Sequence, residues 1–370
     1  MVRVEAMVFR RSLGCPAPLT AIPMRLESIH LRNVGPLKHY DLSLQDEWRD
    51  NIQTLTLISG PNGCGKSTLL RVVSHLWQMA GHWLALPSNF PGERKSSALW
   101  LGRWGGSAIV LSGIPGTSGR VGVFFGHPSA FKELEPLAEN WIGETKDVRE
   151  GKGPRKRVLI HKSQNWLGEW SEGFKRLGLN PNEQGVSNVI HLDGEERRWI
   201  PPRVGLGEVV ADDPGRRWLV NYWPTSEWRG QVEASLIAMK TVDPERYTEV
   251  LLELNAFLQP KEILFDPDQN MRLRVQTSED REHSLDDLSA GEHQILIQLF
   301  LVSRSLMPGG LVMIDEPDLH LHPSLLSFYL TRLEHLVKSR DAQLILTSHN
   351  PELWSRYEAK GNRVQLGGGA

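Results

Sequence analysis

One glycine-rich octapeptide constrains this chain more than any other feature. Residues 60–67 read Gly-Pro-Asn-Gly-Cys-Gly-Lys-Ser, a full match to the pattern G-x-x-x-x-G-K-[S/T]. The octapeptide follows a β-rich run at 54–59 and precedes apolar residues that recur at helical spacing from Leu69 to Trp77. A strand, a glycine loop and a helix in this order direct several N–H groups and a helix N-terminus at a phosphate. The motif therefore predicts a phosphate-binding loop in an α/β fold; the alternative is a chance glycine turn.

Each position of this loop has an expected role. Lys66 can reach the β- and γ-phosphates of a nucleotide, and the Ser67 hydroxyl can ligate Mg²⁺. Cys64 fills a variable position and is expected to contribute only its backbone. We therefore expect ATP and Mg²⁺ as cofactors. The predicted contacts are Gly60, Pro61, Asn62, Gly63, Cys64, Gly65, Lys66, Ser67 and Thr68.

A second motif, residues 311–317, reads Leu-Val-Met-Ile-Asp-Glu-Pro. Four apolar residues before two acids indicate a buried strand whose carboxyl end carries a carboxylate pair, where open α/β sheets bind ligands. We expect Asp315 to hold Mg²⁺ through water and Glu316 to polarise the attacking water, as phosphoryl transfer requires. On its own, the acidic pair could equally be a helix entry.

Two shorter motifs follow the same logic. Residues 288–292 read Leu-Ser-Ala-Gly-Glu, in which Ser289 and Glu292 form a capping box at a helix start. A capped helix N-terminus with Gly291 is also suited to binding an anion. The same geometry therefore serves both interpretations, a structural helix cap and an anion site. His349 ends the apolar run 344–347, and a lone histidine of this kind is more often structural.

All four motifs occur in the order of the ATP-binding-cassette (ABC) superfamily. The wording of residues 315–323, Asp-Glu-Pro-Asp-Leu-His-Leu-His-Pro, resembles the soluble AAA-like ABC ATPases of the OLD family and of bacterial anti-phage systems. Residues 29–36, Ile-His-Leu-Arg-Asn-Val-Gly-Pro, look like theirs too. RecF and SMC-type repair proteins are more distant relatives. The resemblance covers about 24–85 and 285–357 and leaves the middle of the chain unassigned.

The resemblance implies an ABC-type P-loop NTPase fold with a mostly parallel central sheet. Ser289, Gly291 and Glu292 would contact the γ-phosphate of ATP held by an opposite subunit, and His349 would bind the γ-phosphate as a switch histidine. Catalysis would then depend on Glu316, His349 and Lys66. The chain would work as a homodimer or higher homo-oligomer around ATP. It would control a separate effector, a nuclease or toxin, in anti-phage defence.

Three alternative functions stay open: a DNA-repair ATPase, the ATPase subunit of a transporter, and a scaffold that ATP locks without turnover. The resemblance places Asp318–Pro323 in a loop that crosses to the partner subunit. His320 and His322 have no nearby cysteine, so zinc is not expected. Only 21 residues follow His349, too few for the nuclease domain of OLD proteins.

The chain is expected to divide into four parts. Residues 1–23 form a leader, 24–85 the first part of the ATPase core, 86–287 an inserted, partly helical subdomain, and 288–370 the rest of the core. The family's glutamine loop should lie in the middle part, where Gln164 is a candidate.

Composition limits the possible partners. The 42 Lys and Arg against 44 Asp and Glu give a net charge of −2, so no global field attracts nucleic acid or membrane. The basic stretch 146–162 permits local DNA or RNA contact, with a solvated loop as the alternative, and flanking Trp141, Trp166 and Trp170 could stack bases or form a small core. Two cysteines and no membrane-length apolar run predict a cytoplasmic protein without a membrane partner.

Overall fold

The computed structural model describes most of the chain. The described residues are 22–46, 51–90, 96–148, 156–161, 165–179, 186–195, 197–201, 217–222, 231–319, 321–360 and 363–367.

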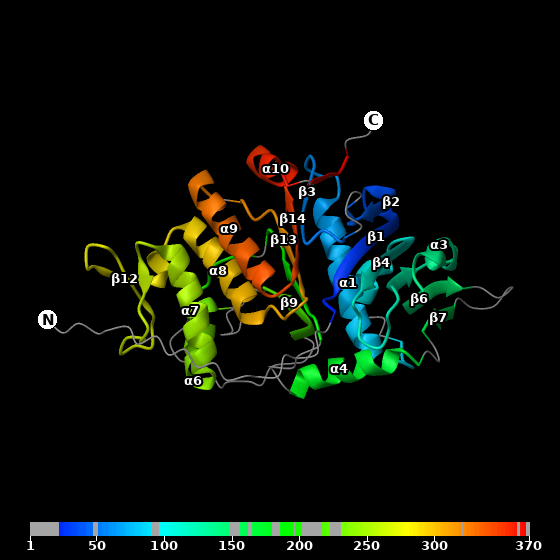
Figure 1. Cartoon of the computed structure of the whole chain (residues 1–370), viewed down its shortest axis with the longest axis horizontal. Helices are drawn as coiled ribbons and strands as arrows, with labels where there is room; N and C mark the ends of the chain where they lie inside the picture. Colours follow the sequence, from blue (N-terminus) through cyan, green and yellow to red (C-terminus); the bar gives the residue numbers. More distant parts are fainter. Residues whose placement is uncertain are drawn as a thin grey trace.

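A six-stranded parallel sheet stands at the centre of the molecule (Figure 1). Every pair of neighbouring strands in it runs parallel. In spatial order the strands are β15 (Arg363–Gln365), β3 (Leu55–Ser59), β14 (Gln343–Ser348), β13 (Leu311–Asp315), β8 (Val189–Leu192) and β9 (Leu219–Asn221). The predicted strands at 54–59, 311–314 and 344–347 are therefore confirmed, and they are neighbours in one sheet.

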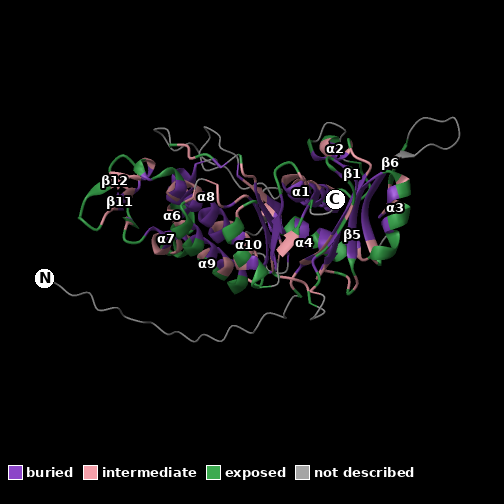
Figure 2. Cartoon of the chain, turned by 90° about the horizontal axis from the view of Figure 1, so that it is seen from above, coloured by how far each residue is buried: buried purple, intermediate pink, exposed green. Residues whose placement is uncertain are grey.

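Both faces of this sheet are buried, as continuous apolar runs predict for parallel strands. Val312 and Ile314 face one hydrophobic core, which the helices α6–α9 complete. Leu311 and Met313 face the other core, which α1 shares with a second sheet. Figure 2 shows the resulting band of buried residues through the middle of the molecule. The sheet is thus the shared wall of two cores.

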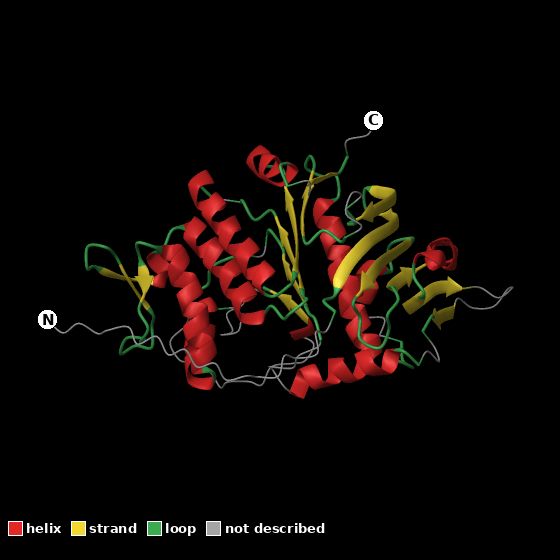
Figure 3. Cartoon of the chain, viewed as in Figure 1, coloured by secondary structure: helices red, strands yellow, loops and turns green. Residues whose placement is uncertain are grey.

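Helices cover the first face (Figure 3). They are α6 (Val232–Val242), α7 (Pro244–Leu258), α8 (Ala290–Ser305) and α9 (Pro323–Ser339), and α10 (Pro351–Glu358) follows β14. The helical conformation breaks between α6 and α7 because Pro244 starts α7 with Asp243 as its cap. A small antiparallel sheet of β10 (Glu262–Ile263), β11 (Arg274–Gln276) and β12 (Glu282–Ser284) lies beyond them.

On the other face, α1 (Lys66–Ala85) lies between the parallel sheet and a second six-stranded sheet (Figure 1). In spatial order its strands are β2 (Leu37–Ser43), β1 (Arg25–Val34), β4 (Gly106–Ser112), β5 (Val121–Gly126), β6 (Asn140–Val148) and β7 (Lys156–Leu159). All pairs are antiparallel except β5 with β6. The helix α3 (Pro128–Leu134) packs on this sheet, whereas α2 (Ser96–Leu101) and α4 (Leu167–Leu179) pack against α1.

The middle of the sequence is interleaved with the rest. Residues 86–287 are partly helical, but β4 pairs with β1 and β8 pairs with β13, so this stretch supplies strands to both large sheets. Two of its tryptophans, Trp170 and Trp218, help to fill the core between them: Trp218 stacks 4.0 Å from Trp77 of α1, and each of these two indole N–H groups donates to the other residue's carbonyl. Trp170 packs against both rings. These tryptophans therefore build a core. None of the described helices is both long enough and apolar enough to cross a membrane.

Candidate functional site

The glycine loop, Asp315, Glu316 and His349 meet at one edge of the parallel sheet. β14 lies between β3 and β13, with Ser348 opposite Ser59 and Thr347 opposite Asp315. The glycine loop after β3, His349 after β14 and Glu316 after β13 therefore share the carboxyl edge, where ligands of parallel α/β sheets bind.

The phosphate-binding loop has the backbone that its glycines predict. Gly65 caps α1 in a left-handed conformation, with φ 106°. A side chain on Gly60 would place its Cβ 2.5 Å from the carbonyl oxygen of Leu366, so only glycine fits there. The helix begins at Lys66, which leaves Ser67 and Thr68 on its first turn. This loop and helix start suit an anion such as a nucleotide phosphate.

Lys66 lies folded over its own loop. Its Nζ donates to the carbonyl oxygens of Gly60 at 2.9 Å and Pro61 at 3.1 Å, and the side chain is buried. Both acceptors are neutral, and among the described residues no carboxylate forms an ion pair with this ammonium. A buried cation without a counter-charge fits a phosphate-bearing ligand.

The acidic strand end, Asp315–Glu316, is held by the neighbouring strand. The Thr347 hydroxyl donates to the buried Asp315 carboxylate, and the Glu316 N–H donates to the Thr347 carbonyl at 3.2 Å and hydroxyl at 3.0 Å. The Glu316 carboxylate then lies 3.2 Å from Nδ1 of His349. The structure thus brings the residue predicted to polarise the attacking water next to the residue predicted to bind the γ-phosphate.

A short network fixes the turn that carries His349. The Ser348 hydroxyl donates to Asp318 at 2.9 Å and accepts from the Asn350 N–H at 2.9 Å. Asn350 in turn caps α10, which Pro351 begins. His349 is itself half-exposed, so its ring can face both Glu316 and a ligand.

The capping box at the start of α8 is confirmed. The Ser289 N–H donates to the Glu292 carboxylate at 2.8 Å, and the Glu292 N–H donates to the Ser289 hydroxyl at 3.3 Å. Lys261 forms an ion pair with Glu292 at 2.7 Å. Burial opposes ionisation of Glu292, but Lys261 and Ser289 hold its pKa below the ordinary value. In the part of the chain that the structure describes, no hydrogen bond or ion pair joins Ser289, Gly291 or Glu292 to the phosphate-binding loop.

Sequence reasoning missed a further acid at this edge. Asp193 directly follows β8, next to the strand that carries Asp315, and it accepts from the Arg71 guanidinium at 2.8 and 3.1 Å. Burial opposes ionisation, but the Glu195 N–H and Arg71 keep the pKa of Asp193 below its usual value. The only sequence signal for it is the short run Val189–Leu192, apolar except for His191, before an Asp-Gly pair.

Several other predicted candidates lie elsewhere or outside the description. Gln164 and His320 fall outside the described residues, as do Arg149, Lys152, Arg155 and Lys162 of the basic stretch. His322 caps α9 by accepting from the Ser324 N–H, and Arg157 pairs with the buried Glu144 at 2.8 Å. Within the described residues, no group of three or more His, Cys, Asp or Glu side chains could hold a metal.

Two families match the sequence. A family described as "AAA domain, putative AbiEii toxin, Type IV TA system" matches residues 208–355, and a family described as "AAA domain" matches residues 24–79. The second match contains the phosphate-binding loop, and the first contains Ser289, Glu316 and His349. Both being AAA domains, they support a P-loop ATPase.

Individual proteins are similar to this chain only over a short segment or at low sequence identity. Protein ea59 of Escherichia phage lambda is 41% identical over 58 residues, which is 15% of this chain and 11% of that protein. The SMC head domain from Thermotoga maritima is 14% identical with a TM-score of 0.41, covering 90% of this chain and 91% of that one. A dimeric bacterial ABC transporter cassette is 13% identical with a TM-score of 0.38, covering 91% and 94%. No conclusion about this chain rests on these two solved structures, because both TM-scores lie below 0.5.

Proposed function

We propose that this chain binds ATP with Mg²⁺ at the edge formed by β3, β14 and β13 and hydrolyses it. The observation that most supports this proposal is the 3.2 Å contact between the Glu316 carboxylate and Nδ1 of His349, which lies at the same sheet edge as the Lys66 loop. A base, a histidine and a phosphate cradle at one edge are the parts that phosphoryl transfer needs.

The donor set suits Mg²⁺–ATP. The hydroxyl of Ser67 and the carboxylate of Asp315 would hold the metal, since hard cations prefer oxygen ligands. When bound, Mg²⁺ would neutralise charge that develops on the phosphates. Glu316 would orient the attacking water and accept its proton, and His349 would donate to the γ-phosphate. Lys66 would leave its loop carbonyls for the phosphate oxygens.

We further propose that two copies complete each other's sites. The Ser289 turn is a capped helix start that makes no bond to its own phosphate-binding loop among the described residues, which leaves it free to meet the nucleotide of a partner. Such a dimer would transmit ATP state to a separate effector in anti-phage defence. Two similarities support a role in anti-phage defence. One matched family is described as a toxin of a toxin–antitoxin system, and a 58-residue segment is similar to protein ea59 of a phage.

The Glu316→Gln variant tests the hydrolytic role. It keeps the size and loses the base, so we expect ATP to bind with unchanged affinity while turnover falls at least about a hundredfold. Glu352→Gln, an exposed position in the first turn of α10, is the matched control and should turn over ATP at the wild-type rate. Near-normal turnover in Glu316→Gln would remove Glu316 from its role.

Lys66→Ala tests the binding site. Removing the ammonium leaves the phosphates without their main cation, so calorimetry should show ATP affinity weakened more than about tenfold. Unchanged affinity would contradict the phosphate-loop assignment. Unchanged melting temperature would show that the loss is local.

A further inference from the structure

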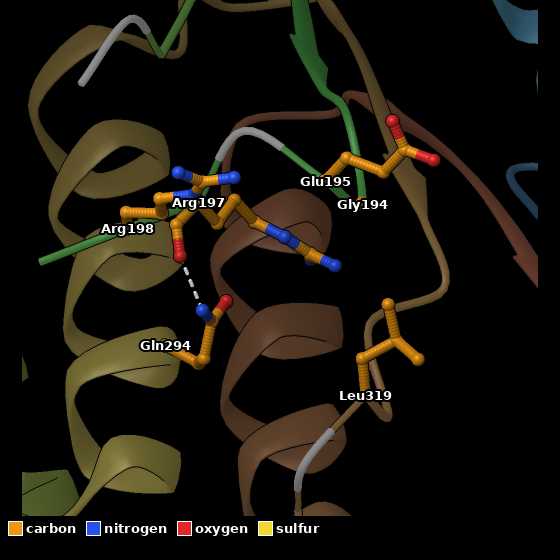
Figure 4. A pocket seen from close by; sticks show the side chains of 6 residues that line it. All are labelled: Gly194, Glu195, Arg197, Arg198, Gln294 and Leu319. Atoms are coloured by element: carbon orange, nitrogen blue, oxygen red, sulfur yellow. Dashed lines mark hydrogen bonds between the residues drawn. The ribbon is translucent and has the colours of Figure 1, made fainter.

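A buried arginine lies beneath the acidic strand end. Arg197 comes from the segment after β8, and its side chain is 2% exposed. Its Nη2 donates to the carbonyl oxygen of Asp315 at 2.9 Å and of Glu316 at 2.8 Å. Figure 4 shows this side chain beside a cavity of about 400 Å³, pointing toward the loop of Leu319, whereas Arg198 turns the other way.

Packing alone does not require an arginine at this position. Its Nε and Nη1 are buried without a hydrogen-bond partner, and no carboxylate among the described residues forms an ion pair with it. Burial lowers the pKa of Arg197, against the attraction of Tyr329, Asp315, Asp193 and Asp318. A buried guanidinium with two unmet donors is costly, and an apolar side chain would fill the space more cheaply. The two hydrogen bonds to the Asp315 and Glu316 carbonyls offset part of the free-energy cost of burying this guanidinium.

Those two carbonyls flank a backbone conformation that side chains rarely adopt. Glu316 has φ 46°, in the left-handed region. Thr347 accepts from the Glu316 N–H on one side, and Arg197 donates to the Glu316 carbonyl on the other. The residue is therefore clamped through both of its peptide groups, and its carboxylate is directed at His349.

The segment that carries Arg197 is anchored in turn to α8. The Gln294 side-chain amide donates to the Arg197 carbonyl. Two residues further on, the Trp199 ring stacks on His293 at 4.4 Å and 10°, and its indole N–H donates to Asp286 at 2.7 Å. The guanidinium thus projects from a backbone fixed by the first turns of the helix that follows the Ser289 turn.

We propose that Arg197 is a positioning residue that holds Glu316 in its left-handed conformation and so aims the carboxylate at the reacting water. This inference rests on the proposed ATPase function. Arg197 would act through the Asp315 and Glu316 carbonyls that it contacts.

Arg197→Gln, Arg197→Lys and the control Arg198→Gln test this role. Misplacing the base by about 1 Å should lower turnover about a hundredfold in Arg197→Gln, while the Kd for ATP changes less than about twofold. The lysine ammonium can donate to both carbonyls, so Arg197→Lys should recover much of the rate. Arg198→Gln removes the same charge from an exposed neighbour and should keep the wild-type rate.

The outcomes separate this inference from the function it rests on. Wild-type turnover in Arg197→Gln would overturn the positioning role, and so would an equal loss in the glutamine and lysine variants accompanied by an equal loss of melting temperature. If the wild-type chain does not hydrolyse ATP, the proposed function fails, and the crystal structure of Arg197→Lys or Arg197→Gln still decides the inference. Glu316 keeping φ near 46° and its contact with His349 in Arg197→Gln would overturn it.

Discussion

Charged side chains divide into two groups by their partners. Arg157 with Glu144 and Arg272 with Glu233 are ion pairs between a buried carboxylate and a well-placed guanidinium, and they stabilise the scaffold. Lys66 and Arg197 are buried too, yet they donate only to backbone carbonyls. A cation buried against neutral acceptors is expensive. Both lie at the carboxyl edge of the parallel sheet, where we propose that ATP binds.

Two histidines near this edge predict how stability depends on pH. Burial lowers the pKa of His191 to about 4, with Asp193 and Asp315 opposing and Arg71 adding to the shift. Burial, His191 and Arg71 lower the pKa of His75 to about 4 as well. From pH about 6.5 down to about 4 the unfolded chain binds protons that the folded chain does not. The free energy of unfolding should therefore fall with pH, by up to about 1.4 kcal/mol per histidine and pH unit.

Melting temperatures measured between about pH 7.5 and about pH 5 check this expectation. The decrease should be smaller in His191→Gln than in the wild type, because one of the histidines that bind a proton on unfolding is gone. His335→Gln replaces an exposed histidine of α9 and should leave the wild-type decrease unchanged. A His191→Gln profile parallel to the wild type would show that His191 does not drive the loss.

Among the elements, those with local signals were predictable. Continuous apolar runs predicted β3, β13 and β14, and the Ser289 capping box predicted the start of α8. The pairing of β1 with β4 was not predicted, because α1 separates the two strands in the sequence and glycines occur in β4 and in its neighbour β5. Four-residue β8 was missed as well, since His191 interrupts its apolar run. Pairing between distant segments depends on packing that no local pattern contains.

The close packing of α1 against the tryptophan core predicts the effect of a substitution at Gly81. Gly81 lies in the last turns of α1, and a Cβ there would come within 2.8 Å of the Trp218 ring and 3.1 Å of Phe174. Gly81→Ala should therefore push apart the stacked tryptophans and destabilise the protein by about 1–3 kcal/mol, despite the better helix propensity of alanine. Urea unfolding measures this change.

Gly168→Ala is the matched control. Gly168 lies in α4, and a Cβ there would meet no atom within 4 Å. The same substitution should be neutral or stabilise the protein by up to about 1 kcal/mol. Stabilisation by Gly81→Ala of the same size would contradict the close contact between α1 and the tryptophan core.

For the molecule as a whole, the sequence supplied the parts of the site but not their arrangement. The motifs named Lys66, Glu316 and His349, and the order β3-β14-β13 brings them to one edge. Asp193 and Arg197 could not be identified in this way. Their place at the site depends on β8 lying next to β13, and sequence periodicity does not specify that pairing. The Ser289 turn is the exception, because it stays apart from its own phosphate-binding loop among the described residues. That separation is what a site shared between two subunits would look like.

Mixing two inactive variants tests the shared site. Lys66→Ala removes the phosphate grip, and Ser289→Glu places a negative charge where the partner's γ-phosphate would lie, so each homodimer should lack ATPase activity. In a mixed dimer both defects fall in one site, while the other combines an intact loop with an intact Ser289 turn. Random mixing should restore at most about a quarter of wild-type turnover, since half the dimers carry one good site of two.

Titrating one variant into the other at constant total protein should give a maximum of ATPase activity near equal amounts. A mixture as inactive as its components, with both variants folded and able to associate, would place the whole site within one chain. A wild-type rate per chain that does not change on dilution to a monomer would do the same.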